Sequence, residues 1–107
     1  MVRVFVLDLD IENKQTELNQ GDVHYYLADT FRVSLEDNVM HAFVVKAENI
    51  KLDGGLVKYK HQANDANKNI SVYSEGDRCV VKNMKIVNAR YPRPFVGVDL
   101  ETNIETI

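Results

Sequence analysis

The chain has 107 residues, of which 45% are hydrophobic, and a formal net charge of −3 at pH 7. This length supports one compact core and excludes a second domain, so residues 1–107 are expected to form a single domain. No apolar run of about 18 residues is present, and Asp8 and Asp10 interrupt the N-terminal apolar segment. We therefore expect no membrane contact and an intracellular protein, in the nucleus or cytoplasm, or in a host cell if it is viral.

The charge is distributed unevenly along the sequence. Residues 1–45 carry three Lys or Arg against eight Asp or Glu, residues 46–93 carry ten against five, and residues 94–107 carry none against three. The basic middle is either the solvated face of several strands or a surface that binds a polyanion.

The N-terminal segment 2–11 is predicted to be a strand. Its first half, from Val2 to Leu7, is apolar on both faces, which is typical of a central strand, whereas Asp8, Asp10 and Glu12 alternate outward in its second half. The polar segment 12–22 is expected to be a loop.

The next segments predict two further strands, 23–29 and 31–35, joined by a turn near Asp29. Segment 34–49 is ambiguous, because Val44 and Val45 favour a strand while its apolar residues also fall on one helical face. Ser34 followed by Asp37 resembles a helix N-cap with an acidic first turn, so a helix of about three turns is the preferred interpretation.

The Asp53-Gly54-Gly55 sequence between two short apolar runs predicts a β-hairpin over residues 50–60. A polar loop is expected at 61–69, a short strand at 70–73 and a turn at Gly76-Asp77. No internal repeat is apparent in the sequence.

The C-terminal region predicts a second hairpin. Its first strand covers 78–90, and the inward phase changes near Lys82 and Asn83, which indicates a bulge. The Tyr91-Pro92-Arg93-Pro94 corner leads into a second strand, 95–104, with strict period-2 alternation.

Five strands with one helix after the third can be laid onto the oligonucleotide/oligosaccharide-binding (OB) β-barrel. Tyr26-Leu27-Ala28-Asp29 and the segment from Glu75 to Asn83 resemble single-stranded-DNA-binding OB domains of the replication protein A and SOSS type. The expected fold is therefore mainly β: a small OB-like barrel with one short helix and an inserted hairpin, since the family usually lacks the segment 51–69.

Single-strand binders combine cations that follow the phosphates with aromatic faces on which bases stack. This chain interleaves the two residue types, and the resemblance places the segment 90–95 at the loop between the last two barrel strands. The candidate nucleic-acid-binding residues are Lys58, Tyr59, Lys60, Tyr73, Lys82, Lys85, Arg90, Tyr91, Arg93 and Phe95. In the alternative interpretation Tyr91 and Phe95 cap the barrel and the arginines are solvated.

The sequence favours a non-enzymatic protein without metal or cofactor. His24, His41 and His61 are scattered, and the glycines match neither a phosphate loop nor a dinucleotide fingerprint. Cys79 is the only cysteine, and its strand pattern predicts a buried apolar residue, not a nucleophile.

Two other functions remain open beside single-stranded nucleic-acid binding. One is a small protein-interaction subunit of a genome-maintenance complex, and the other is a viral or phage structural or inhibitor protein. A protein partner or a homo-oligomer is expected in these cases. Salt separates nucleic-acid binding from protein docking, because phosphate contacts weaken steeply with ionic strength and apolar docking does not. Size exclusion at several concentrations distinguishes the structural protein, which should self-assemble.

Overall fold

A computed structural model describes residues 2–63, 65, 67–89, 94–101 and 104–106 of the chain. These residues form strands, turns and loops, with no helix among them. The strands are β1 (Arg3–Leu7), β2 (Asp10–Glu12), β3 (Thr16–Leu18), β4 (Val23–Leu35), β5 (Phe43–Val45), β6 (Ile50–Tyr59), β7 (Val72–Ser74), β8 (Cys79–Lys82), β9 (Lys85–Val87), β10 (Phe95–Val96), β11 (Asp99–Leu100) and β12 (Glu105–Thr106).

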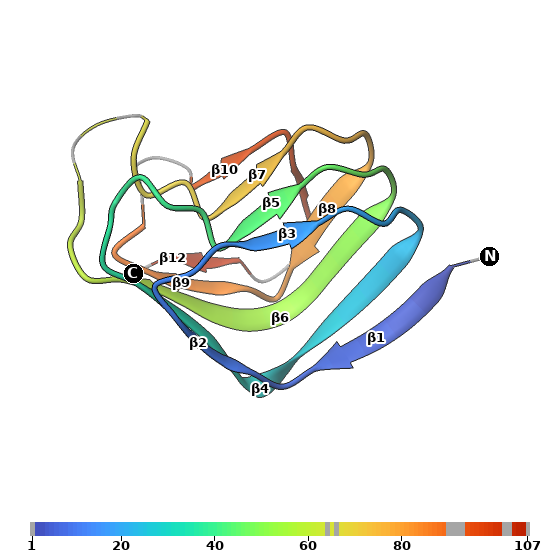
Figure 1. Cartoon of the computed structure of the whole chain (residues 1–107), viewed down its shortest axis with the longest axis horizontal. Helices are drawn as coiled ribbons and strands as arrows, with labels where there is room; N and C mark the ends of the chain where they lie inside the picture. Colours follow the sequence, from blue (N-terminus) through green and yellow to red (C-terminus); the bar gives the residue numbers. More distant parts are fainter. Residues whose placement is uncertain (1, 64, 66, 90–93, 102–103, 107) are drawn as a thin grey trace.

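The strands wind into a parallel β-solenoid of about three turns (Figure 1). One sheet has the order β1-β4-β6-β8-β11, and the second has the order β10-β7-β5-β3. The two middle coils each contribute one long strand, β4 or β6, to the first sheet, whereas β1 with β2 and β8 with β9 take that place in the first and last coils. The second sheet receives one short strand per coil. Equivalent positions therefore lie in register from coil to coil, as Val23, Ile50 and Cys79 do.

The expected OB barrel is therefore wrong. Among the described residues every strand pair is parallel, whereas the predicted hairpins require antiparallel neighbours. β8 pairs with β11 of the following coil in parallel, and β10 pairs with β7, so the C-terminal hairpin does not form.

The predicted helix over 34–49 is also wrong. β4 continues to Leu35, a loop follows, and Phe43–Val45 forms β5 with Phe43 and Val45 buried. The β-branched pair Val44 and Val45 thus outweighs the helical spacing, because burial on alternate positions matches a strand. Segment 16–18 forms a short strand inside the region expected to be a loop.

The predicted inserted hairpin is one bent strand instead. β6 runs through Gly54 and Gly55, which have φ of 101° and 87°, and it pairs with β4 on both sides of the bend, with a register shift between Leu27 and Arg32. A hairpin turn also requires positive φ, so the two glycines correctly predicted a change of chain direction at this point. The predicted hairpin was wrong, because the chain bends there without reversing.

The interior is filled by columns of apolar side chains that repeat from coil to coil. One column contains Val33, Val57 and Ile86, and another contains Phe43, Val72 and Phe95. Cys79 lies in this interior as a free, buried thiol, which confirms its predicted apolar role.

The break predicted near Lys82 and Asn83 is confirmed too, since β8 ends at Lys82 and Asn83 has a φ of 56°.

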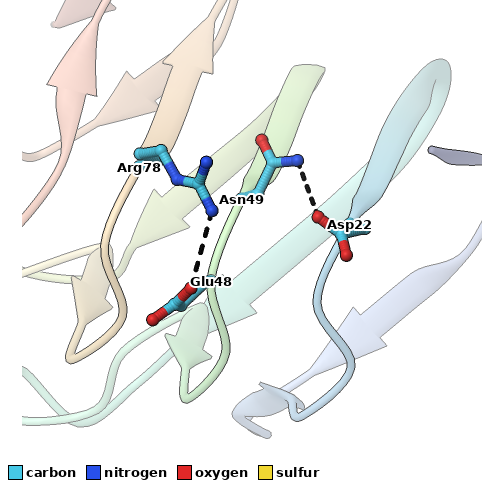
Figure 2. Close-up of polar contacts among 4 residues, drawn as sticks. All are labelled: Asp22, Glu48, Asn49 and Arg78. Carbon is cyan, nitrogen blue, oxygen red and sulfur yellow. Dashed lines mark hydrogen bonds and ion pairs between the residues drawn. The ribbon is translucent and has the colours of Figure 1, made fainter. Parts of the chain in front are cut away.

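One corner of the solenoid repeats a left-handed backbone conformation. Asp22, Asn49 and Arg78 precede β4, β6 and β8 and have φ of 58°, 57° and 58°. Figure 2 shows that the side-chain amide of Asn49 donates to Asp22 Oδ1 at 2.8 Å, while Arg78 Nη2 lies 3.5 Å from Glu48 Oε2. Asn and Asp tolerate this conformation better than other residues with a side chain, so the corner favours them.

Candidate functional site

The predicted nucleic-acid-binding residues do not gather on one described surface. Tyr59 and Phe95 are buried in the core, and the hydroxyl of Tyr59 donates to the backbone carbonyls of Met40 and Ile70. Tyr73 lies on the second sheet, whereas Lys82 and Lys85 lie on the first. Arg90, Tyr91 and Arg93 lie outside the described residues.

Lys58, Lys82 and Lys85 share the outward face of the first sheet, because each alternates with buried neighbours along β6, β8 and β9. Lys58 and Lys60, with Ser34, Leu35 and Glu36, line a hollow of about 210 Å³. Lys82 Nζ lies 3.7 Å from Asp53 and 4.0 Å from Glu101, so nearby carboxylates offset its charge. The barrel cleft that motivated nucleic-acid binding is replaced by a solenoid, and single-stranded-DNA binding therefore loses its structural basis.

A second hollow, of about 460 Å³, lies where the long strands bend. Its lining residues are Tyr26, Leu27, Asp29, Asp53, Gly54, Gly55, Leu56, Asn83 and Lys85. A Cβ built on Gly54 would lie 2.5 Å from the carbonyl oxygen of Leu27, so this close approach of β4 and β6 requires glycine. Asp53 accepts a hydrogen bond from Asn83 Nδ2 at 2.7 Å and lies beside Lys82, so its carboxylate is already engaged. Within the described part of the chain, no group of three or more His, Cys, Asp or Glu side chains is arranged to hold a metal ion.

The most unusual surface is the outer edge of β1. Among the strands that the structure describes, the first sheet ends at β1, which pairs with β4 alone, and Figure 1 shows it at the periphery beside β4. The N–H of Arg3 donates to the carbonyl of Asp22 at 2.9 Å. Because backbone groups alternate in direction along a strand, Arg3, Phe5 and Leu7 direct theirs toward β4, and Val4 and Val6 direct theirs to the free edge.

The side chains on this edge are apolar and exposed. Val4 is 58% exposed and Val6 73% on the outer face, and Phe5 is 43% exposed on the inner face. The ring of Phe5 stacks on that of Tyr25 with a centroid separation of 6.0 Å. The column that begins with Phe5 and Tyr25 continues into the buried Leu52 and Val81. The apolar interior is therefore left open at this end of the solenoid.

β1 was predicted to begin as a central strand, and this is wrong for a single copy of the chain, where β1 is an edge strand. Its apolar residues on both faces are nevertheless typical of a central strand. Isolated edges are usually protected by lysine, proline, a bulge or inward charge. Arg3 gives the start of β1 one charge in the inward phase, but between Val4 and Leu7 β1 has none of these devices. Acidic side chains appear only further on, at Asp8 and in β2. We define the outward edge of residues 2–7 as the β1 edge.

The sequence contains the signal for this edge, namely the run from Val4 to Leu7, which is apolar on both faces. What pattern reasoning misses is which strand lies beside it, because β1 pairs with β4, across an intervening segment that contains two other strands. Tyr25, which supports Phe5 from the next coil, is likewise absent from the predicted residues.

Comparison of the chain with protein-family models, with curated proteins and with solved structures finds no match in any of the three. None of the described residues belongs to a helix long and apolar enough to cross a membrane.

Proposed function

We propose that this chain is a non-enzymatic protein-interaction module, in which the solenoid presents the β1 edge to an extended segment of another polypeptide. The proposal depends on one observation: a strand with apolar side chains on both faces has an unpaired backbone edge. Main-chain hydrogen bonds to such an edge supply affinity, and the alternate side chains supply specificity.

Burial gives the larger driving force for this pairing. Complete burial of an aliphatic side chain stabilises by roughly 1.5 to 3 kcal/mol, whereas one exposed hydrogen bond exchanged with water contributes about 1 kcal/mol. Val4 and Val6 are more than half exposed, so part of that apolar contribution is available to a partner strand that covers their free flank.

The state of Cys79 supports a role without covalent chemistry. The thiol is buried, and that burial raises its pKa to about 11, whereas nucleophilic cysteines are accessible and have a lowered pKa.

The direct test measures, by fluorescence anisotropy, how a fluorescein-labelled peptide with the sequence of residues 2–9 binds to the protein. Saturable binding that changes little between low and moderate salt is expected, because apolar and main-chain contacts are weakly screened. The control peptide carries N-methyl groups at the positions of Val4 and Val6, which removes the donors on that side while keeping the side chains. Equal binding of both peptides, or no binding up to the solubility limit of the protein, would reject the β1 edge as a docking site.

A further inference from the structure

We infer that the polypeptide that covers the β1 edge is a second copy of this chain, paired antiparallel about a two-fold axis that passes beside Phe5. This inference rests on the proposed function and specifies its partner. A two-fold axis perpendicular to the sheet brings the same edge of each copy together and closes the assembly as a dimer.

The direction of the backbone groups determines the register. Only residues with edge-facing groups exchange hydrogen bonds, and between Arg3 and Leu7 these are Val4 and Val6. If Phe5 lies on the axis, Val4 of each copy is opposite Val6 of the other, so both valines of both copies are paired. Shifting the axis to Val4 or Val6 leaves the other valine opposite Val2 or Asp8, respectively. The register centred on Phe5 therefore places both valines of β1 in contact across the interface, Val4 of each copy against Val6 of the other.

The same register accounts for the exposed aromatic ring. Residues on the axis form a non-hydrogen-bonded antiparallel pair, in which the side chains approach most closely. Phe5 would contact Phe5 of the second copy while keeping its stack on Tyr25. Four rings then join the apolar columns of the two solenoids into one continuous interior, closing the end that is open in a single copy.

Two copies could also stack head to tail, with the last coil of one copy on the first coil of the next. Repulsion between acidic side chains disfavours this arrangement. The first coil carries Asp8, Asp10 and Glu12, and the last described strands and the adjoining Glu101 carry Asp99, Glu101 and Glu105. Continued in the register of the sheet, such a stack would place Glu105 opposite Asp10, and this like-charged pair opposes it, while Asp99 and Glu101 would fall opposite Val4 and Val6. In the two-fold pair, β2 extends beyond the paired segment on opposite sides of the axis, so the acidic residues separate.

A single cysteine at the axis tests the register. In Phe5→Cys the two thiols lie opposite each other, within the range that a disulfide spans. In Arg3→Cys they lie about 13 Å apart, since a strand rises about 3.3 Å per residue. Under mild oxidation Phe5→Cys is expected to form covalent dimer at least tenfold faster than Arg3→Cys, and a mixture of Arg3→Cys and Leu7→Cys is expected to crosslink between the two variants. The buried Cys79 is present in every sample. Equal rates in the two single variants would overturn the register.

Light scattering across a dilution series tests the dimer itself, with no cysteine introduced. The parent chain is expected to change from twice the monomer mass to the monomer mass on dilution. Val6→Pro should weaken this association more than tenfold and leave the thermal unfolding of the monomer close to that of the parent, because the N–H it removes faces the free edge. Val39→Lys is the matched control, since Val39 is 53% exposed in a loop away from β1. It should dimerise like the parent.

Two outcomes separate this inference from the proposed function. If the parent chain is monomeric at every concentration but binds the peptide of residues 2–9, the second copy is wrong and the β1 edge remains a docking site for another polypeptide. If the chain is dimeric and Val6→Pro dimerises equally well, while the peptide does not bind, both proposals are overturned.

Discussion

The side-chain amide of Asn49 donates a hydrogen bond to the carboxylate of Asp22 at 2.8 Å, and the two residues occupy the same left-handed corner in successive coils. The backbone is connected at the same corner, since the N–H of Asp22 donates to the carbonyl of Glu48 at 3.0 Å and that of Asn49 to Asp77 at 2.9 Å. This corner therefore connects adjacent coils directly before β4, β6 and β8 begin.

Replacing Asn49 with alanine should destabilise the fold by roughly 1 to 3 kcal/mol, because the left-handed conformation and the hydrogen bond to Asp22 are both affected. Asn49→Gly is the matched control: it keeps the positive φ without strain and loses the hydrogen bond alone, so its cost should be smaller. Urea unfolding monitored by far-UV circular dichroism measures both. Alanine and glycine variants of equal stability would show that the positive φ contributes nothing.

Gly76→Ala should destabilise by about 2 kcal/mol or more, in the range of overpacked interiors. A Cβ on Gly76 would overlap the carbonyl of Ala47 in the neighbouring coil, and the backbone there cannot move without breaking the coil-to-coil hydrogen bonds. In Gly21→Ala the new Cβ would lie 2.8 Å from the carbonyl oxygen of Glu48, a less severe overlap. Thermal unfolding should therefore give Gly76→Ala a lower melting temperature than Gly21→Ala. The reverse order would contradict the close approach of Gly76 to the carbonyl of Ala47.

Stability should decrease as the pH rises from about 9 to about 11. Burial raises the pKa of the Cys79 thiol from 9.0 to about 11, with Ser74 opposing and Asp99 adding to the shift. The folded chain retains this proton where the unfolded chain has lost it, so the contribution is complete below pH 9 and is lost through pH 11. A shift of this size corresponds to roughly 2 to 3 kcal/mol.

The control for this pH dependence is Cys79→Ala, which should show a shallower slope of unfolding free energy against pH between 9 and 11. Burial also raises the pKa of Tyr59, so that tyrosine adds a loss above pH 10 that parent and variant share. Identical slopes in both proteins would contradict the protonated, buried thiol.

Tyr59→Phe should destabilise by about 1 to 3 kcal/mol without loss of the fold. The hydroxyl of Tyr59 donates to the carbonyls of Met40 and Ile70, the latter at 3.1 Å, and phenylalanine leaves these buried acceptors without that donor. Tyr26→Phe is the control, since its ring is exposed. A variant as stable as the parent would show that water replaces the lost donor.

The β content, the positions of several bends and the buried Cys79 were predictable from the sequence, because alternation, glycine and strand composition are local signals. Which strands pair with each other, and in which direction, could not be predicted from the sequence. Gly54 and Gly55 fit a hairpin and a bent solenoid strand equally well, since both need positive φ. Ser34 and Asp37 fit a helix N-cap, yet Ser34 still belongs to β4 and Asp37 lies in the loop between β4 and β5.

The coil repeat escaped detection for a physical reason. Equivalent positions share burial and backbone conformation more than residue type, as Asp22, Asn49 and Arg78 at one corner illustrate. The candidate site was missed because Val4 and Val6 predict a covered strand without specifying what covers it, and long-range register decides that.

The most direct test of the β1 edge is residue-resolved amide hydrogen exchange by NMR. In the dilute chain, the amides of Arg3 and Phe5 should exchange slowly, because they donate to β4, and those of Val4 and Val6 should exchange rapidly. Adding excess peptide of residues 2–9, or raising the protein concentration until the chain dimerises, should slow exchange at Val4 and Val6 without changing that at Arg3 and Phe5. Rapid exchange at Val4 and Val6 under both conditions would contradict docking of a strand at this edge.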